Sequence, residues 1–374
     1  MESTIIYHQA EPEALQSVYQ EFNNCDFVLN VGAGRSLVRN SIRVCGDLRI
    51  TSDGVTRTTG QNYFDFRIGV HSFVDSLQVV FGGASNGGVK ENIQNYARWA
   101  AMQSVASLNE DDYLNASNLV ELRAPNQLCV ERFADGEITS QTTAPQTIDF
   151  DFAMKPYCIL NKMSGDHLPF EKSDEIRLTL NLARNISALM GSLAGNTSTY
   201  ELRNLRVQYQ SVETQMDPMK TSTMMRSVYN VKSSIQSSSA NVTAQVPAVC
   251  DAVSASFQRQ DEENTNVFNN YALAQVPSIS RVQFLFNSAT NKYITYEIND
   301  QNSMLEKYIE SFKNTGHNQC YLDTFRTNGG FGIGLDFDGM VDLSRQQFSV
   351  QLSSQITNQY PYNIYLYFHS VVQA

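Results

Sequence analysis

Three runs of alternating apolar and polar residues close the sequence, and they constrain the fold more than any other feature. They cover Phe331–Phe337, Gln347–Leu352 and Asn363–Phe368, with polar bends between them. In each run every second residue is apolar, which is typical of a half-buried strand in an antiparallel sheet. We therefore expect three C-terminal strands, the last of them paired into a sheet.

The same alternation predicts strands over most of the remaining chain. These strands cover residues 41–50, 63–68, 73–81, 147–152, 176–182, 202–209, 282–286 and 293–298. Apolar residues at helical spacing predict helices over residues 11–22, 90–104 and 303–313, with Ser303 and Glu306 as a capping box for the last. Between residues 214 and 263 the pattern assigns no strands.

The two halves repeat one order of elements: a strand, a turn, a helix, a long loop and closing strands. This order predicts an all-β fold of two tandem eight-stranded antiparallel jelly rolls, with short helices in the loops. We assign residues 1–38 to an N-terminal arm with a short amphipathic helix, 39–213 to the first jelly roll and 214–374 to the second.

Composition narrows the classes of function. The net charge of −11 argues against direct binding to nucleic acid, whose backbone is bound by clustered Lys and Arg. The N-terminus does not resemble a secretory signal, and no run of about 18 apolar residues predicts a membrane span. The six cysteines are scattered and without a CxxC pair, so we interpret them as reduced thiols.

Candidate chemical motifs are weak. Asn30–Leu37 begins like a dinucleotide fingerprint but lacks the third glycine, so we interpret it as a loop. Asp336, Asp338 and Asp342 could bind calcium or act as an acid–base pair, but a solvated or hydrogen-bonded strand face is the better interpretation.

Other chemically reactive residues also lack a supporting pattern. The five histidines are far apart and form no HxxxH or HxH pair (His8, His71, His167, His317 and His369). Ser344 and Cys158 have no activating motif beside them. Trp99 is interpreted as a packing anchor, and Met216–Met225 as an adaptable contact surface. We therefore predict no catalytic, cofactor-binding or metal site.

Three groups of residues resemble a known family. The first is Gly69–Leu77 with Glu91–Arg98, the second Lys155–Lys162 with Leu202–Tyr209, and the third Phe331–Arg345 with Pro361–Tyr367. In this order they resemble the double jelly-roll major capsid proteins of icosahedral DNA viruses, and they are most similar to those of Polinton-like viruses.

This resemblance implies a structural protein of the virion capsid, assembled inside the host cell and without enzyme activity. It implies homotrimeric capsomers of pseudo-hexameric outline that tile an icosahedral shell, with neighbouring trimers, penton and minor capsid proteins as partners. Residues 107–150 would form an outer tower. The N-terminal arm would lie at the base and contact a neighbour, a minor capsid protein or an inner membrane.

Two other functions are compatible with the pattern. One is a two-domain β-sandwich protein that binds carbohydrate or attaches to a host. The other is a β-sandwich glycosidase, which would need two carboxylates about 5–10 Å apart in a cleft.

Overall fold

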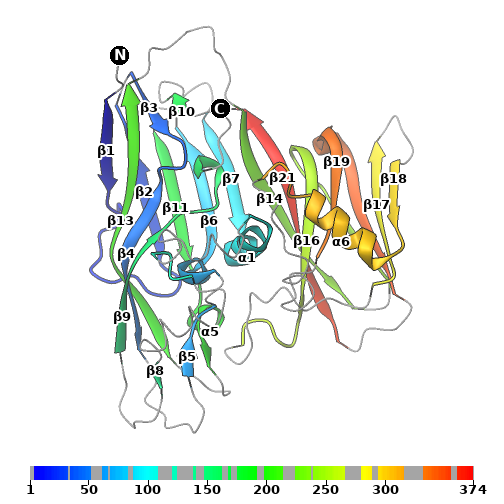
Figure 1. Cartoon of the computed structure of the whole chain (residues 1–374), viewed down its shortest axis with the longest axis horizontal. Helices are drawn as coiled ribbons and strands as arrows, with labels where there is room; N and C mark the ends of the chain where they lie inside the picture. Colours follow the sequence, from blue (N-terminus) through cyan, green and yellow to red (C-terminus); the bar gives the residue numbers. More distant parts are fainter. Residues whose placement is uncertain are drawn as a thin grey trace.

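Two units built almost entirely of β-strands lie side by side along the longest axis of the molecule (Figure 1). The computed structural model describes residues 4–32, 34–51, 61–65, 68–82, 87–107, 120–123, 138–139, 147–161, 167–169, 175–191, 198–213, 224–236, 239–265, 279–288, 294–315, 332–354 and 360–373. Strands dominate because apolar and polar residues alternate along most of these ranges.

The first unit contains two facing sheets. One has the strand order β1 (Ile5–Ala10), β13 (Thr199–Glu213), β4 (Arg43–Thr51) and β9 (Thr147–Met154). The other has the order β2 (Asn24–Leu29), β11 (Ile176–Leu182), β6 (Val74–Phe81) and β7 (Gly88–Gln94).

Five shorter strands accompany these sheets. Two extend the first sheet, β3 (Arg35–Val38) beside β13 and β10 (His167–Pro169) beside β3. The other three form a small sheet of their own, β12 (Met190–Gly191), β5 (Gln61–Tyr63) and β8 (Ile138–Thr139).

The second unit is built in the same way. Its first sheet has the order β14 (Met224–Ile235), β21 (Tyr362–Gln373), β16 (Val249–Arg259) and β19 (Ile333–Asp342). Its second sheet has the order β15 (Ser239–Ala244), β20 (Gln346–Ser353), β17 (Arg281–Ser288) and β18 (Ile294–Ile298).

The two units share one topology. When the main strands of each unit are numbered in chain order, both units have one sheet in the order 1-8-3-6 and the other in the order 2-7-4-5. In both, a helix follows the fifth strand: α1 (Tyr96–Ser107) after β7, and α6 (Gln301–Glu310) after β18. The predicted fold of two tandem jelly rolls is therefore confirmed, and the repeat seen in the sequence is real.

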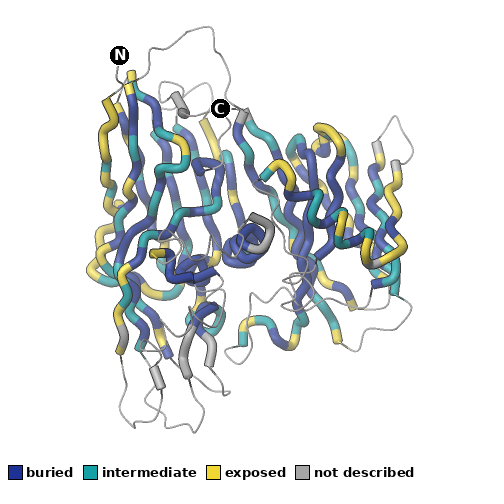
Figure 2. The backbone as a smooth tube through the Cα atoms, viewed as in Figure 1, coloured by how far each residue is buried: buried dark blue, intermediate teal, exposed yellow. Residues whose placement is uncertain are grey.

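Each unit has its own hydrophobic core between its two sheets. Along β11 the buried residues are Ile176, Leu178, Leu180 and Leu182, which face the first core. Along β20, Phe348, Val350 and Leu352 face the second core. Figure 2 shows buried residues running along the strands of both units. Burial of such alternating faces stabilises a sheet by about 25 cal/mol per Å² of apolar surface.

The predicted helix over residues 11–22 is wrong. This segment is irregular, with bends at residues 13, 14 and 17 and a turn at 21–22; Pro12 pairs with Phe27 of β2, and Tyr19 pairs with Leu202 of β13. Its backbone groups thus bond to neighbouring strands instead of forming a helical turn, and Leu15 stays 70% exposed. Strands β1, β2 and β3 pair within the first unit's sheets, so residues before 39 contribute to that unit rather than standing apart from it.

Local boundaries also differ from the predictions. The helix predicted over 90–104 begins at Tyr96, because residues 88–94 pair with β6 as strand β7. The predicted strand over 63–68 ends at Tyr63, and a short 3-10 helix η1 (Gly69–Phe73) precedes β6. Between residues 214 and 263, where the pattern resolves nothing, the structure contains β14, β15 and β16.

Helix α6 has a different N-cap from the predicted one. Asp300 is the capping residue, and its side chain accepts a hydrogen bond of 2.8 Å from the backbone N–H of Ser303. The helix begins two residues before Ser303, so Ser303 and Glu306 do not form the capping box.

Two predictions fall mainly outside the described residues. Most of the proposed tower, residues 107–150, is not described, and neither is the domain boundary between residues 213 and 214. Both stay predictions.

Candidate functional site

The contact between the two units begins where β7 meets β14. These strands run parallel, and Tyr229 lies opposite Asn92. Asn230 supplies hydrogen bonds that the strands do not make: its Oδ1 accepts from the backbone N–H of Gln94, and its Nδ2 donates to the carbonyl of Gln94, each at 2.9 Å. The junction joins sheets from both units into one of eight strands (Figure 1).

A buried carboxylate strengthens this junction. Glu91 on β7 is 3% exposed. Its Oε1 accepts from the backbone N–H of Val228 on β14 at 3.0 Å, and its Oε2 accepts from the N–H of Ile159 in η2 (Ile159–Asn161) at 2.6 Å. A buried carboxylate is tolerated only when such donors replace water, so Glu91 serves to hold three segments together.

Helix α1 of the first unit docks against the second unit. Trp99 is fully buried, and its ring lies 5.3 Å from Tyr367 and 5.5 Å from His369, both on β21. Beside it, Arg98 is 2% exposed. The Arg98 guanidinium donates to the side chain of Gln258 and lies 4.6 Å above the ring of Tyr365. Trp99 is thus the packing anchor that its sequence context predicts.

A polar cluster is buried inside the first unit. Arg123 forms an ion pair of 3.0 Å with Glu121 and donates to Nε2 of His71 at 2.6 Å. The other ring nitrogen of His71 therefore carries the proton and donates to the Tyr96 hydroxyl at 2.8 Å. Arg123 also donates to the Tyr157 hydroxyl at 2.9 Å. The cluster connects η1, α1 and the residues after β9.

The charges of this cluster are set by burial and by its own members. Burial, aided by Arg123, lowers the pKa of His71 to about 4, so the imidazole is neutral at pH 7. Burial alone would raise the pKa of Glu121, but Arg123 and His71 lower it to about 2. The side chains of His71 and Arg123 are 0% and 1% exposed, which leaves no access for a substrate. We interpret the cluster as structural.

The three aspartates singled out in the sequence do not converge on one site. Asp336 is buried and pairs with Lys313, while Asp338 is exposed and lies 3.7 Å from the same Lys313 nitrogen. Asp342 instead caps the short helix η4 (Leu343–Arg345), accepting from the N–H of Ser344 at 3.0 Å. These carboxylates therefore serve as local ion pairs and caps.

The histidines are also dispersed. His8 stacks on Tyr209 at 5.0 Å in the first unit, and His369 donates to or accepts from Ser254 in the second. His317 lies outside the described residues. Within the described ranges, no group of three His, Cys, Asp or Glu side chains is arranged to hold a metal ion.

The other two reactive side chains lie apart from one another. Cys158 is fully buried in the first core, which leaves its thiol no access to a substrate. Ser344 lies in η4 of the second unit, where its hydroxyl donates to Asp342 at 2.5 Å. No histidine contact to Ser344 is seen among the described residues.

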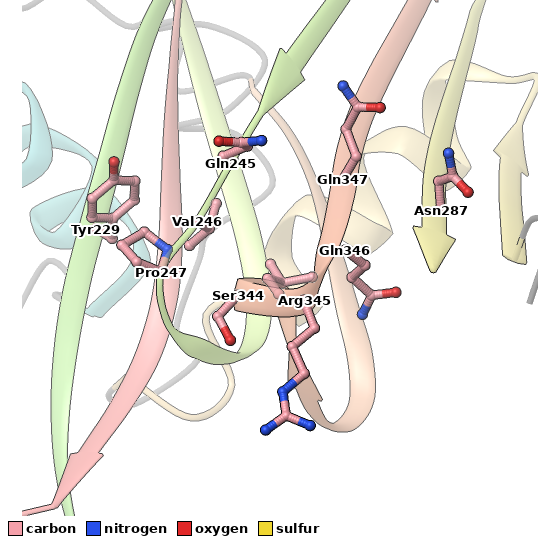
Figure 3. Close-up of a pocket in the computed structure, with 10 residues that line it drawn as sticks. Tyr229, Gln245, Val246, Pro247, Asn287, Ser344, Arg345, Gln346 and Gln347 are labelled. Carbon is pink, nitrogen blue, oxygen red and sulfur yellow. The ribbon is translucent and has the colours of Figure 1, made fainter. Parts of the chain in front are cut away.

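A cavity of about 510 Å³ lies at one end of the second unit (Figure 3). Four of its ten lining residues carry side-chain amides and one is aromatic. The lining residues are Tyr229, Gln245, Val246, Pro247, Asn287, Leu343, Ser344, Arg345, Gln346 and Gln347. Figure 3 shows Arg345 extending away from the other lining residues, and its side chain is 88% exposed. None of these ten described residues carries a carboxylate, so they do not supply the pair that a glycosidase needs.

Comparison with known proteins identifies the fold. No protein-family model matches the sequence, and no curated protein does. Among solved structures, the Faustovirus major capsid protein matches with a TM-score of 0.64 at 9% identity, over 99% of this chain and 90% of that one. The mavirus major capsid protein matches with a TM-score of 0.56 at 8% identity, over 98% and 90%.

A chain in the cryo-EM structure of the Sputnik virophage matches with a TM-score of 0.58 at 12% identity, over 99% of this chain and 88% of that one. At such identities the likeness shows the fold. It extends over both jelly rolls and the junction between them.

Proposed function

We propose that this chain is a viral major capsid protein that forms homotrimeric capsomers of pseudo-hexameric outline in an icosahedral shell. The observation that carries this proposal is the full-length likeness to the Faustovirus and mavirus major capsid proteins, in a chain whose two halves share one strand order. Three copies of a chain with two equivalent units supply six similar units around one axis, which suits hexagonal tiling.

The physical basis of this function is assembly rather than chemistry. A shell is stable when many modest contacts between rigid blocks act together. The rigid block here is the pair of jelly rolls, tied by Glu91, Asn230 and the buried side chain of Trp99. Partners follow from this role: neighbouring trimers, with penton and minor capsid proteins completing the shell in the virion.

The proposal includes no membrane contact through an N-terminal amphipathic helix, because residues 11–22 do not form one. Among the described residues, no helix is long and apolar enough to cross a membrane.

The proposal is tested by the native mass of the purified protein, measured by light scattering on a sizing column. We expect three times the chain mass of 42.0 kDa, unchanged on dilution, and hexagonal outlines by negative-stain microscopy. A monomer at every concentration would contradict the capsomer. It would favour the carbohydrate-binding alternative, for which the polar cavity beside Tyr229 would be tested with glycan arrays.

A further inference from the structure

Each jelly roll ends one sheet with its first strand and the other with its fifth strand. Inside the chain, the fifth strand of the first unit, β7, meets the first strand of the second unit, β14. Of the first and fifth strands of the two units, the described strands leave β1 and β18 without such a neighbour, and these two lie at opposite ends of the molecule (Figure 1). Among the described strands, none pairs with the outer edge of either one.

Strand β14 shows how a first strand behaves when a neighbouring unit covers it. Tyr229 faces the core of the second unit, whereas Val228, on the opposite face of the strand, belongs to the core of the first unit. Val228 is 5% exposed. The outer face of a first strand is therefore an apolar contact surface that the adjacent jelly roll buries.

Strand β1 occupies the same topological position but has no neighbour in the single chain. On its inner face His8 stacks on Tyr209 and Ala10 packs against the first core, although Ile6 at the start of that face is 41% exposed. Its outer face is more open: Ile5 is 52% exposed and Tyr7 is 77% exposed. Figure 2 shows β1 as an exposed strand at the edge of the molecule. An apolar edge strand of this kind is a template for pairing with another chain.

Strand β18 is the counterpart of β7. Both lead into a helix, and Ile298 and Ile93 are buried at equivalent places just before it. Tyr296 lies on the same side of β18 as Ile298 and touches Phe286 at 6.1 Å between ring centroids, yet it is 38% exposed. The inner face of this sheet is therefore apolar up to its last strand, β18, where Tyr296 remains partly exposed.

We propose that β18 of one copy pairs in parallel with β1 of the next copy, so that the β7–β14 junction recurs between chains. This inference rests on the proposed capsomer and names the edges that build it. At the internal junction the inner-face residue Tyr229 lies opposite the outer-face residue Asn92. By the same alternation, Tyr7 and Ile5 of one chain lie beside Tyr296 of the other.

Such a contact joins two different edges, so each copy uses each edge once. Head-to-tail contacts of this kind form a closed ring when the rotation between copies allows it. The pairing also buries the exposed side chains of Ile5 and Tyr7, as Val228 is buried inside one chain.

The first test is cysteine cross-linking of the purified trimer. A chain carrying Tyr7→Cys and Tyr296→Cys is oxidised mildly and run on a non-reducing denaturing gel. We expect covalent trimers, because paired neighbouring strands bring Cα atoms within about 4.4–6.8 Å, the range a disulfide spans. The matched control carries Tyr296→Cys with Met340→Cys, since Met340 is also an exposed apolar residue, at 58%. The control and the parent chain should stay uncross-linked.

The second test is substitution of one exposed residue. Tyr7→Asp places a carboxylate in an apolar contact, which should raise the concentration at which the trimer dissociates by about tenfold or more. Met340→Asp should leave it unchanged. If the parent is a trimer but neither Tyr7→Cys nor Ile5→Cys cross-links with Tyr296→Cys, and Tyr7→Asp has no effect, the edge pairing is wrong while the capsomer stands. A monomeric parent contradicts both.

Discussion

At the scale of single residues, hydrogen-bond donors of the protein take the place of water around two buried carboxylates. Glu91 holds the junction through two backbone N–H groups, and Glu121 is neutralised by Arg123. Each carboxylate would cost several kcal/mol to bury alone. Both instead contribute directional bonds that fix the arrangement of the segments around them.

The His71 cluster predicts a pH dependence of stability. The folded pKa of His71 is lowered to about 4, so the unfolded chain binds more protons between that pH and the unperturbed pKa near 6.5. Stability contributed by neutral His71 is complete above about pH 6.5 and is lost as pH falls towards 4. Glu121, with its pKa lowered to about 2, adds a loss that begins near its ordinary pKa of 4.5.

Urea unfolding followed by circular dichroism from pH 7 to pH 4 measures this effect. We expect the free energy of unfolding to fall with pH in the parent, and to fall less steeply in His71→Gln. His8→Gln is the comparison: burial also lowers the pKa of His8, but this side chain is only partly buried and lies outside the cluster, so its removal should change the slope less. An unchanged slope in His71→Gln would show that His71 is not buried as a neutral group.

At the scale of elements, the two helices are held by different means. Helix α1 buries Trp99 between the units. Helix α6 instead packs against two glycines, Gly332 just before β19 and Gly334 within it. A Cβ added at Gly334 would lie 2.6 Å from the Ser311 hydroxyl and 3.0 Å from the Tyr308 Cα. The close approach of α6 to β19 therefore requires glycine there.

Gly334→Ala should lower the free energy of unfolding by about 1–3 kcal/mol, since the added methyl group must displace the end of α6. Gly339→Ala is the matched control on the same strand, because nothing lies within 4 Å of its added Cβ. Equal urea midpoints for the two variants would show that α6 does not approach β19 so closely.

The cap of α6 can be tested in the same way. Asp300→Ala removes the acceptor for the backbone N–H of Ser303 and should cost about 0.5–2 kcal/mol of stability. Glu306→Ala should have a much smaller effect, because Glu306 lies on an exposed turn of the helix. The reverse order in thermal or urea unfolding would favour the capping box of Ser303 and Glu306 over the observed cap.

At the scale of the whole molecule, the two jelly rolls share a sheet and a helix. The eight-stranded sheet contains strands of both units, and residues of β21 and α6 belong to the core of the first unit, among them Tyr367 and Tyr308. Such shared burial couples the units, so the opening of one removes contacts from the other.

This coupling predicts cooperative unfolding. Trp99 is the sole tryptophan and lies in the contact between the units, so its fluorescence reports that contact. We expect fluorescence and far-ultraviolet circular dichroism to give coincident urea transitions. Asn230→Ala, which removes both bonds to Gln94, should move the fluorescence transition to lower urea. A fluorescence transition that already precedes the dichroism transition in the parent would show that the units unfold separately.

Much of this fold follows from the sequence alone. Alternation in stretches such as 176–182 and 347–352 predicts strands because only the apolar face of each is buried. Spacing around Tyr96, Ala97 and Ala100 predicts a buried helix, and the repeated order of elements predicts two jelly rolls. These features depend on neighbours in sequence, so the local pattern carries them.

Other features depend on the tertiary structure. Leu15 and Phe22 have helical spacing, yet the segment is not helical because β2 and β13 supply partners for its backbone. Strand β14 shows little alternation, because its two faces enter two different cores. His71 and Arg123 are 52 positions apart in sequence and meet in the buried cluster. Glu91 on β7 and Val228 on β14 are 137 positions apart and meet at the junction. Long-range contacts of this kind leave no local pattern, so only the packed chain determines them.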